Sequence, residues 1–213
     1  SRIRIQRKRS KGPRLARPVA MILLVDHKDS FTRNLEHLLS DFEEVVVLDR
    51  LEATEVANLE ESRMVVFSPG PGKPADYPET QALYHQLRGK KPILGVCLGF
   101  QLMLQEEGAR IVRQPQVLHG VETEIETDPE SVTYAGIEPP VKVGRYHSLQ
   151  VESSSLSHLP TGIRTTARDR IRNVPLSFED CERRLFGMQY HPESFLTSHG
   201  HAILANVIHY CMG

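Results

Sequence analysis

The sequence predicts an α/β fold: a mixed, largely parallel central sheet with flanking helices and a smaller antiparallel part. First, short apolar segments alternate with segments of helical periodicity from Met21 to Gly108, which is typical of parallel strands joined by crossover helices. Second, shorter alternating segments, typical of antiparallel strands, follow Gly108. The chain of 213 residues, 39% hydrophobic and 25% charged, is long enough for one domain with a sizeable core.

The first half of the chain predicts four buried strands and three helices. Asp29 or Ser30 can cap a helix whose apolar side chains, beginning with Phe31, share one face at helical spacing. Gly108 ends the helix that follows the last of these strands. The predicted strands are 21–26, 44–48, 64–67 and 92–96, and the predicted helices are 31–39, 54–59 and 99–107.

The second half predicts antiparallel strands and a closing helix. Turn residues at Gly136, Pro139-Pro140 and 160–162 separate the apolar segments. A helix over 199–210 aligns its apolar side chains on one face, so we expect it to pack on the sheet. The predicted antiparallel strands are 109–112, 121–126, 141–143, 163–167 and 185–190.

Residues 1–20 form a basic segment that differs from the rest of the chain. The segment has no acidic residue and no sustained apolar periodicity, so we expect a disordered tail or linker, with the folded domain over 21–213. An Arg-rich targeting segment, a nucleic-acid tail and the junction of a larger fused polypeptide remain alternatives. Its eight basic residues are Arg2, Arg4, Arg7, Lys8, Arg9, Lys11, Arg14 and Arg17.

Charge and cysteine content argue against several classes of protein. The formal net charge is −1, but residues 21–213 hold 18 of the 26 basic residues and all 27 acidic ones, so we expect no nucleic-acid partner. Cys97, Cys181 and Cys211 are too few for a disulfide framework and indicate a reducing, cytoplasmic location. No apolar segment approaches the ~20 residues that span a bilayer, so we expect no membrane partner.

The stretch Gly95-Val96-Cys97-Leu98-Gly99 is the main candidate for a reactive site. A strand enters it and a helix leaves it, so Cys97 lies at the tip of a tight turn between two glycines, as in a nucleophile elbow. The start of a helix favours a thiolate and leaves backbone N–H groups free to bind an oxyanion. Taken alone, these residues are equally consistent with a buried structural cysteine.

A second glycine-rich loop, Ser68-Pro69-Gly70-Pro71-Gly72, follows another predicted parallel strand. Because the carboxyl ends of parallel strands meet at one edge of a sheet, we expect this loop to face Cys97 across a crevice. The N–H of Gly70 could then complement that of Leu98 as an oxyanion donor. A plain turn is an alternative, and so is a phosphate loop, although the Gly-Lys-Ser/Thr ending of a nucleotide site is missing.

The segment Gln189-Tyr190-His191-Pro192-Glu193-Ser194 provides a candidate base for the cysteine. His191 can take the proton of a thiol and return it to a leaving group, and Glu193 can orient the imidazole. Pro192 is expected to keep the segment extended, so that both side chains point to the same side. Taken alone, a His-Pro-Glu tripeptide is usually a surface turn.

The remaining histidines carry no comparable pattern. We expect most of them, including His27 and His85, to be structural. His199 and His201 suggest a metal site, but no cysteine or carboxylate cluster accompanies them, so we predict no metal.

Six stretches, in the same order along the chain, resemble class I, triad-type glutamine amidotransferases, specifically the small subunits of anthranilate and aminodeoxychorismate synthases. The resemblance covers roughly nine-tenths of the chain and implies a flavodoxin-like, three-layer α/β fold. Phe100 and Val121 depart from the family pattern, which usually has His and Lys there. The six stretches are 26–32, 68–72, 95–101, His119-Gly120, 145–149 and 189–194.

The resemblance implies a role for each candidate residue. Cys97, His191 and Glu193 would form a catalytic triad that hydrolyses L-glutamine to glutamate and ammonia through a glutamyl thioester. The backbone amides of Gly70 and Leu98 would hold the oxyanion. The residues implied to bind glutamine are Gly70, Gly72, Gln101, Ser148 and Leu149, the last two through their backbone.

The resemblance also implies a partner. Ammonia would pass to a chorismate-binding synthase, as a separate subunit or a fused domain, for anthranilate or 4-amino-4-deoxychorismate in tryptophan or folate biosynthesis. We expect no cofactor in this chain and a Mg-dependent partner synthase. The alternatives are a phenazine-type or nucleotide-type synthase, or a non-catalytic interaction subunit; the intact triad argues against the last.

Overall fold

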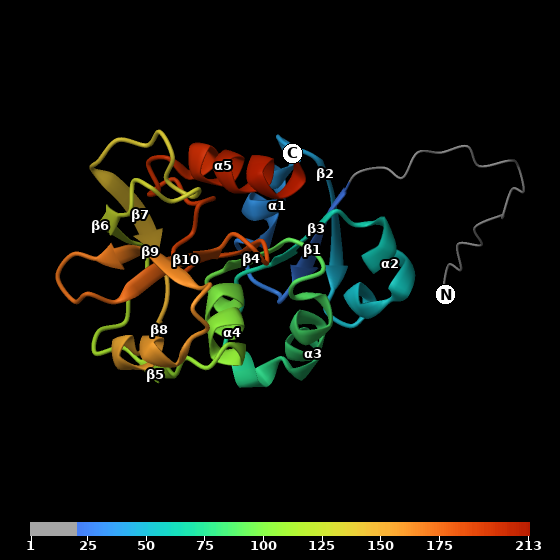
Figure 1. Cartoon of the computed structure of the whole chain (residues 1–213), viewed down its shortest axis with the longest axis horizontal. Helices are drawn as coiled ribbons and strands as arrows, with labels where there is room; N and C mark the ends of the chain where they lie inside the picture. The colour runs from blue at the N-terminus through green and yellow to red at the C-terminus, as the bar shows by residue number, and fades with distance from the viewer. Residues whose placement is uncertain (1–20) are drawn as a thin grey trace, which may run out of the picture.

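A computed structural model describes residues 21–213, apart from the side chains of Val56 and Ala57 (Figure 1). The basic segment 1–20, predicted to be a disordered tail or linker, lies outside the described residues. The described part begins with a strand at Met21.

A nine-stranded mixed sheet runs through the centre of the molecule. Its first five strands are mutually parallel and its last four continue antiparallel, which confirms the predicted mixed, largely parallel sheet. From one edge to the other the strands are β2 (Glu44–Asp49), β1 (Met21–Asp26), β3 (Met64–Phe67), β4 (Ile93–Val96), β11 (Leu185–Met188), β10 (Pro175–Asp180), β9 (Arg164–Asp169), β6 (Val121–Thr127) and β7 (Val141–Arg145).

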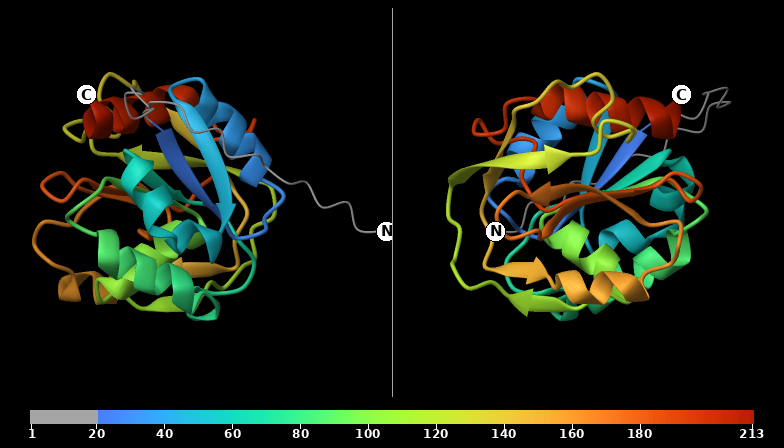
Figure 2. Two further views of the ribbon diagram at one scale, coloured as in Figure 1. Left: turned by 90° about the vertical axis from the view of Figure 1, so that its right-hand side faces the viewer. Right: turned by 60° about the vertical axis from the view of Figure 1, so that its left-hand side comes forward.

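Helices cover both faces of the parallel half, which gives three layers (Figure 1). One face carries α1 (Thr32–Ser40) and α5 (Gly200–Met212), and the other carries α2 (Val56–Glu61), α3 (Pro78–Leu87) and α4 (Leu98–Glu106). A small antiparallel sheet of β5 (Ile111–Arg113) and β8 (Leu149–Val151) lies on the α4 side (Figure 2). The 3₁₀ helices are Glu52–Thr54, Pro74–Asp76 and Ser153–His158.

The core is divided into two clusters, one on each face of the sheet. In β1, Ile22 and Leu24 belong to the cluster under α1 and α5, whereas Leu23 and Val25 belong to the cluster under α3 and α4. All four side chains are fully buried. A strand that is buried on both faces has apolar side chains at successive positions rather than at alternate ones. This explains why residues 21–25 are all apolar.

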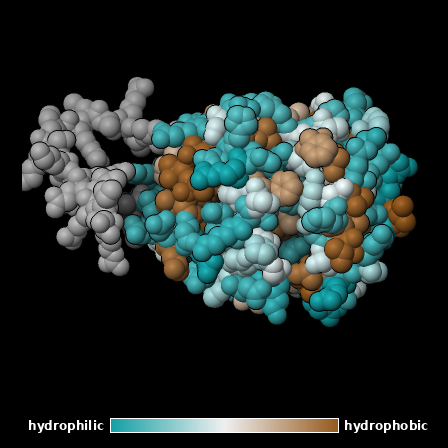
Figure 3. Space-filling view, turned by 180° about the vertical axis from the view of Figure 1, so that it is seen from behind, coloured by the Kyte–Doolittle hydropathy of each residue, from teal (hydrophilic) through white to brown (hydrophobic). Residues whose placement is uncertain are grey.

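The rear face is mostly hydrophilic, with hydrophobic residues in separate patches (Figure 3). Among the large hydrophobic side chains of residues 21–213, Ile171 and Phe195 are the most exposed, at 94% and 92%. No helix in this part of the chain is long and apolar enough to cross a membrane.

The direction of β11 differs in part from the prediction. The segment 185–190 was expected to be antiparallel, but β11 pairs parallel with β4, with Gly187 opposite Gly95, and antiparallel with β10. The sheet therefore changes direction at this strand. The apolar pattern of a segment does not identify its neighbours, and β11 reaches the centre of the sheet from near the end of the chain.

The start of α1 also differs from the prediction. The helix begins at Thr32 with Phe31 at the N-cap, and neither Asp29 nor Ser30 caps it. Instead the Asp29 carboxylate accepts a hydrogen bond of 2.8 Å from the N–H of Phe31 and forms a turn before the helix.

One α-helix and two strands were not predicted: α3, β8 and β10. The helix α3 starts with Pro78 in its first turn, a signal that was present in the sequence. The strand β10 buries Ser177, Glu179 and Asp180, and such polar residues are typical of a loop. Arg164 donates to the Glu179 carboxylate at 2.7 Å, and this pairing makes the buried charge tolerable.

Candidate functional site

Cys97 occupies a strained turn between β4 and α4. Its φ of 53° and ψ of −99° place it in a region that residues other than glycine rarely adopt. Its N–H donates a 2.8 Å hydrogen bond to the carbonyl of Met188, and its carbonyl accepts one of 3.1 Å from the N–H of Gln101. This is the strand, tight turn and helix that the sequence predicted around the cysteine.

The two glycines beside the cysteine are required by close backbone contacts. A Cβ atom on Gly95 would lie 2.5 Å from the carbonyl carbon of Gly99, and one on Gly99 would lie 2.5 Å from the carbonyl oxygen of Phe67. Neither position leaves room for a side chain, because the contacting atoms belong to the backbone. The glycines therefore hold α4 directly against β3 and β4 and fix the position of the elbow.

The loop 68–72 packs against the elbow, as the shared strand edge predicted. A Cβ atom on Gly70 would lie 2.5 Å from Cδ2 of Leu98 and 2.6 Å from Cβ of His27. Leu98 is the first residue of α4, so its N–H has no carbonyl partner within the helix. The two residues that were predicted as oxyanion donors are therefore neighbours.

His27, which was expected to be merely structural, supports this loop. Its Nδ1 lies 3.1 Å from the carbonyl oxygen of Ser68, and its Nε2 lies 3.0 Å from the hydroxyl of Thr80 in α3. Burial lowers the pKa of His27 to about 4, against the partly compensating hydrogen bond to Ser68, so the ring is neutral near pH 7. A neutral imidazole thus ties the loop to both β1 and α3.

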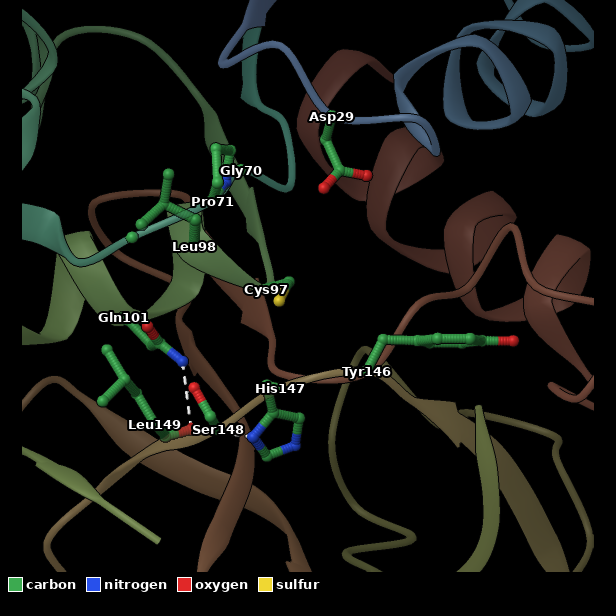
Figure 4. Close-up of a pocket in the computed structure, with 11 residues that line it drawn as sticks. Asp29, Gly70, Pro71, Cys97, Leu98, Gln101, Tyr146, His147, Ser148 and Leu149 are labelled. Carbon is green, nitrogen blue, oxygen red and sulfur yellow. Dashed lines mark hydrogen bonds between the residues drawn. The ribbon is translucent and has the colours of Figure 1, made fainter. Parts of the chain in front are cut away.

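Seven of the predicted residues line one pocket of about 210 Å³, which surrounds the Cys97 sulfur (Figure 4). The predicted residues in its lining are Gly70, Gly72, Cys97, Leu98, Gln101, Ser148 and Leu149. The lining also contains Asp29, Pro71, Tyr146 and His147, to which the sequence analysis gave no role in the site.

His191 and Glu193 meet, although the segment that carries them is not extended. The N–H of Ser194 donates to the carbonyl of His191 at 3.2 Å, which closes a turn, so the expected extended conformation is wrong. Within this turn Nδ1 of His191 lies 2.7 Å from the Glu193 carboxylate, and both side chains are buried. Since a carboxylate only accepts, Nδ1 carries a hydrogen, and Nε2 is the nitrogen that can exchange a proton.

The surroundings of His191 favour its protonated form. The ring packs against Phe31 and Tyr146, with centroid distances of 4.8 and 5.0 Å, and does not line the pocket itself. Burial alone would lower its pKa, but the Cys97 sulfur and the Glu193 carboxylate outweigh burial and raise the pKa to about 10. A protonated His191 beside Cys97 would stabilise a thiolate.

His147, in contrast to His191, is neutral. Nδ1 of His147 donates to the carbonyl of Leu149 at 2.7 Å, and Nε2 accepts from Nε of Arg145 at 3.1 Å. Burial and the Arg145 charge lower its pKa to about 3, so the ring is neutral and its tautomer is fixed. The Arg145 guanidinium is itself buried and paired with Asp169 at 2.5 Å. A charged histidine and a neutral one therefore lie near each other in the site.

The structure shows the surroundings of Phe100, one of the two departures from the family pattern, and of His201 near the C-terminus. Phe100 is fully buried and packs on Phe178, with ring centroids 5.8 Å apart. His201 lies 3.7 Å from Asp41. Within residues 21–213 no group of three His, Cys, Asp or Glu residues is placed to hold a metal ion.

Comparisons with known proteins were consistent with the sequence resemblance. Residues 23–211 match the family model described as glutamine amidotransferase class-I. "Aminodeoxychorismate synthase component 2" of Escherichia coli is 38% identical over 191 residues, which cover 89% of this chain and 100% of the relative. "Anthranilate synthase component II" of Haloarcula marismortui is 35% identical, with 91% and 98% covered, and "Aminodeoxychorismate/anthranilate synthase component 2" of Bacillus subtilis is 34% identical, with 88% and 95% covered.

Solved structures match the fold. A protein of Thermoplasma acidophilum assigned to GMP synthase has a TM-score of 0.77 at 20% identity, covering 91% of this chain and 94% of the other. A glutamine amidotransferase of Thermotoga maritima has a TM-score of 0.64 at 17% identity, covering 91% and 82%. At these identities the likeness concerns the fold alone.

Proposed function

The chain belongs to the class I glutamine amidotransferases, and from this premise we propose that it is the glutaminase subunit of a synthase that aminates chorismate. The relatives with 34–38% identity are named as component 2 of aminodeoxychorismate synthase, of anthranilate synthase, or of both. The observation that carries the catalytic part of the proposal is the convergence of the elbow, the loop 68–72 and the His191–Glu193 pair around one sulfur.

The first half of the reaction forms a thioester. The Cys97 thiolate attacks the carboxamide carbon of glutamine, so that a C–S bond forms and the carbonyl oxygen becomes an oxyanion. The backbone N–H groups of Gly70 and Leu98 hold this oxyanion. Nε2 of protonated His191 gives its proton to the departing nitrogen, the C–N bond breaks, and ammonia leaves.

The second half releases glutamate. His191, now neutral, takes a proton from water through Nε2, and the resulting hydroxide oxygen attacks the thioester carbon. The same oxyanion donors act again, the C–S bond breaks, and the cysteine leaves as a thiolate beside protonated His191. Throughout both halves Glu193 keeps the hydrogen on Nδ1 and thereby fixes the orientation of the ring.

The amino-acid head of glutamine occupies the end of the pocket away from the loop 68–72. Gln101, together with the backbone of Ser148 and Leu149, lines that end, and Gly72 lies at the pocket wall. The neutral His147 accepts a hydrogen bond from Arg145 without adding a second positive charge beside His191.

Ammonia then passes to a chorismate-binding partner, where it forms anthranilate or 4-amino-4-deoxychorismate. Relatives of similar identity are named for each pathway and one is named for both, so we include both products in the proposal. The solved neighbour assigned to GMP synthase matches only in fold and does not favour a nucleotide acceptor. We further propose that 21–213 is the folded unit, and that the three free cysteines reflect a cytoplasmic location.

The covalent mechanism is tested by glutamate release from glutamine. We expect Cys97→Ala to lower the rate at least about 10³-fold, because the nucleophile is removed. The matched control is Cys181→Ala, which changes a partly buried cysteine outside the pocket and should keep the wild-type rate. Glutamate release by Cys97→Ala at more than a tenth of the wild-type rate would overturn the mechanism.

The acceptor is tested by adding the chorismate-aminating subunit of each pathway. With glutamine, wild-type protein should support amination and Cys97→Ala should not, whereas an ammonium salt should support amination with either. If glutamate is released but no aminated chorismate product forms with either partner, the glutaminase assignment stands and the chorismate assignment is wrong.

A further inference from the structure

Gln189 is a buried residue in contact with the nucleophile, and the proposed mechanism gives it no role. It follows β11 and is fully buried. Its Nε2 lies 3.8 Å from the Cys97 sulfur, within hydrogen-bond range for sulfur, and its Oε1 lies 2.9 Å from Nε2 of Gln101. Its backbone N–H donates to the carbonyl of Leu176 at 2.8 Å, which fixes the start of the side chain.

The direction of these hydrogen bonds is set by the backbone. The carbonyl oxygen of Leu149 can only accept, and it lies 3.2 Å from Nε2 of Gln101 (Figure 4). The Gln101 NH₂ group must therefore occupy that side, and its second hydrogen points to Gln189. The oxygen of the Gln189 amide therefore faces Gln101, and its NH₂ group faces the sulfur. With the amide flipped, the NH₂ groups of Gln189 and Gln101 would face each other, and neither could accept a hydrogen bond.

We propose that Gln189 is a further residue of the reacting centre, whose amide N–H donates a hydrogen bond to the Cys97 sulfur and favours its thiolate form. A donor aimed at a charged group stabilises the charged form. The sulfur carries that charge twice in a turnover, before it attacks glutamine and again when the thioester breaks. Gln101 is the positioning residue that keeps the donor turned toward the sulfur. The proposal rests on the proposed glutaminase function.

His191 and Gln189 act on the Cys97 sulfur in different ways. His191 supplies charge and exchanges a proton, whereas Gln189 supplies a neutral, permanent donor that cannot lose its hydrogen near pH 7. The amide is held in a fully buried site, so its hydrogens have no water to bind, and the sulfur is its acceptor. The arrangement therefore favours the thiolate without adding a second positive charge.

The test is the rate of alkylation of Cys97 by iodoacetamide as a function of pH, followed by mass spectrometry of the Cys97 peptide. In Gln189→Met, which removes the donor and keeps the length of the side chain, we expect the midpoint of the profile to rise by about one pH unit. At pH values below both midpoints, the alkylation rate should fall about tenfold. Gln189→Glu, which sets a carboxylate against the sulfur, should shift the midpoint further in the same direction.

Controls separate this effect from loss of structure. Gln81→Met removes a glutamine of α3 that donates to Glu106 at 2.8 Å, away from the pocket, and should keep the wild-type profile. For glutamate release, Gln189→Met should lower kcat about tenfold and leave KM within about twofold, because Gln189 does not line the pocket. A Gln189→Met profile that coincides with the wild-type profile would overturn the proposal.

A second measurement leaves Gln189 unchanged, so it does not depend on whether a variant at position 189 folds. In wild-type protein, the side-chain amide ¹⁵N signals of Gln189 should shift on titration from low to high pH in step with the Cys97 alkylation profile, and should not shift in Cys97→Ala. Signals that stay constant in wild-type protein would also overturn the proposal. Because alkylation requires no turnover of glutamine, failure of the glutaminase assignment and failure of the Gln189 proposal give different results.

Discussion

Two regions of the site are held in place by different forces. We call residues 68–72 and 97–99 the nucleophile wall, and residues 145–149 and 189–194 the histidine wall. Steric contact fixes the nucleophile wall: Cβ atoms on its glycines Gly70 and Gly99 would both lie 2.5 Å from neighbouring atoms. Polar side chains fix the histidine wall, through the pairs Arg145–Asp169 and His191–Glu193.

The difference explains how one site can hold a strained cysteine and a charged histidine. A backbone that is packed without space keeps the elbow in its strained conformation, since relaxation would require a strand to move. Charge states in the histidine wall, in contrast, depend on burial and on neighbouring charges. We therefore expect the first wall to respond to added volume and the second to removed charge and to pH.

The largest effect is expected from added volume in the nucleophile wall. In Gly99→Ala the new Cβ would lie 2.5 Å from the carbonyl oxygen and 2.7 Å from the Cβ of Phe67, so α4 must move. We expect the free energy of unfolding to fall by about 3 kcal/mol and glutamate release to be lost. Urea denaturation and the glutaminase assay check this.

The control for that prediction is Gly89→Ala, in the turn before β4. Gly89 has a φ of +74° but nothing within 4 Å of an added Cβ, so only the backbone conformation opposes the change. We expect the free energy of unfolding to fall by about 1 kcal/mol and glutamate release to be unchanged. Equal losses at both positions would mean that steric contact does not hold the nucleophile wall.

Removal of a charge from the histidine wall should affect activity more than stability. Glu193→Gln keeps the shape of the side chain but removes the carboxylate that helps to raise the pKa of His191. We expect kcat for glutamate release to fall about 10²-fold, because the ring is less well oriented and less readily protonated. The alkaline limb of the kcat profile should move to lower pH, since His191 then loses its proton earlier.

Glu124→Gln provides the comparison, because Glu124 forms an exposed ion pair with Arg170 outside the pocket. Its kcat profile should match that of wild-type protein. A Glu193→Gln variant with wild-type kcat and an unshifted alkaline limb would show that Glu193 does not orient or charge His191.

The smallest effect is expected from protonation of His147. The folded pKa of about 3 lies below the usual 6.5, so below pH 6.5 the unfolded chain binds a proton that the folded protein does not. His147 should therefore remove about 1 kcal/mol of stability between pH 7 and pH 5.5. In His147→Asn, the fall in the free energy of unfolding over this interval should be smaller by about that amount, as measured by urea denaturation.

His191 does not contribute to this loss. Its raised pKa of about 10 gives stability that is fully present below pH 6.5 and is lost as the pH rises toward 10. If His147→Asn keeps the wild-type dependence between pH 7 and pH 5.5, His147 is not held neutral by the fold.

Much of the nucleophile wall could be predicted from the sequence, because its signals are local. The spacing of Gly95, Cys97 and Gly99 within five residues, between an apolar strand and a helix, predicted the elbow that the structure contains. Alternation of strands and helices placed the loop with Gly70 at the same edge of the sheet. The resemblance added Gln101, which lines the pocket.

The histidine wall and its supports depended on contacts between distant residues. Gln189 meets Cys97 across 92 positions and Gln101 across 88, and no local pattern marks such a pair. One support of the nucleophile wall was likewise not predicted, because only the fold places Ser68 and Thr80 beside the ring of His27.

What the sequence determined by itself is the four strands of the first half of the chain, the sharp turn at Cys97 and the residues around it, since apolar periodicity and glycine spacing act within a few residues of one another. The tertiary structure alone decided that β11 lies parallel to β4, that His191 is charged while His147 is neutral, and that Gln189 reaches the sulfur. The reason is that pairing direction, burial and the charge of a buried group depend on which distant segments become neighbours.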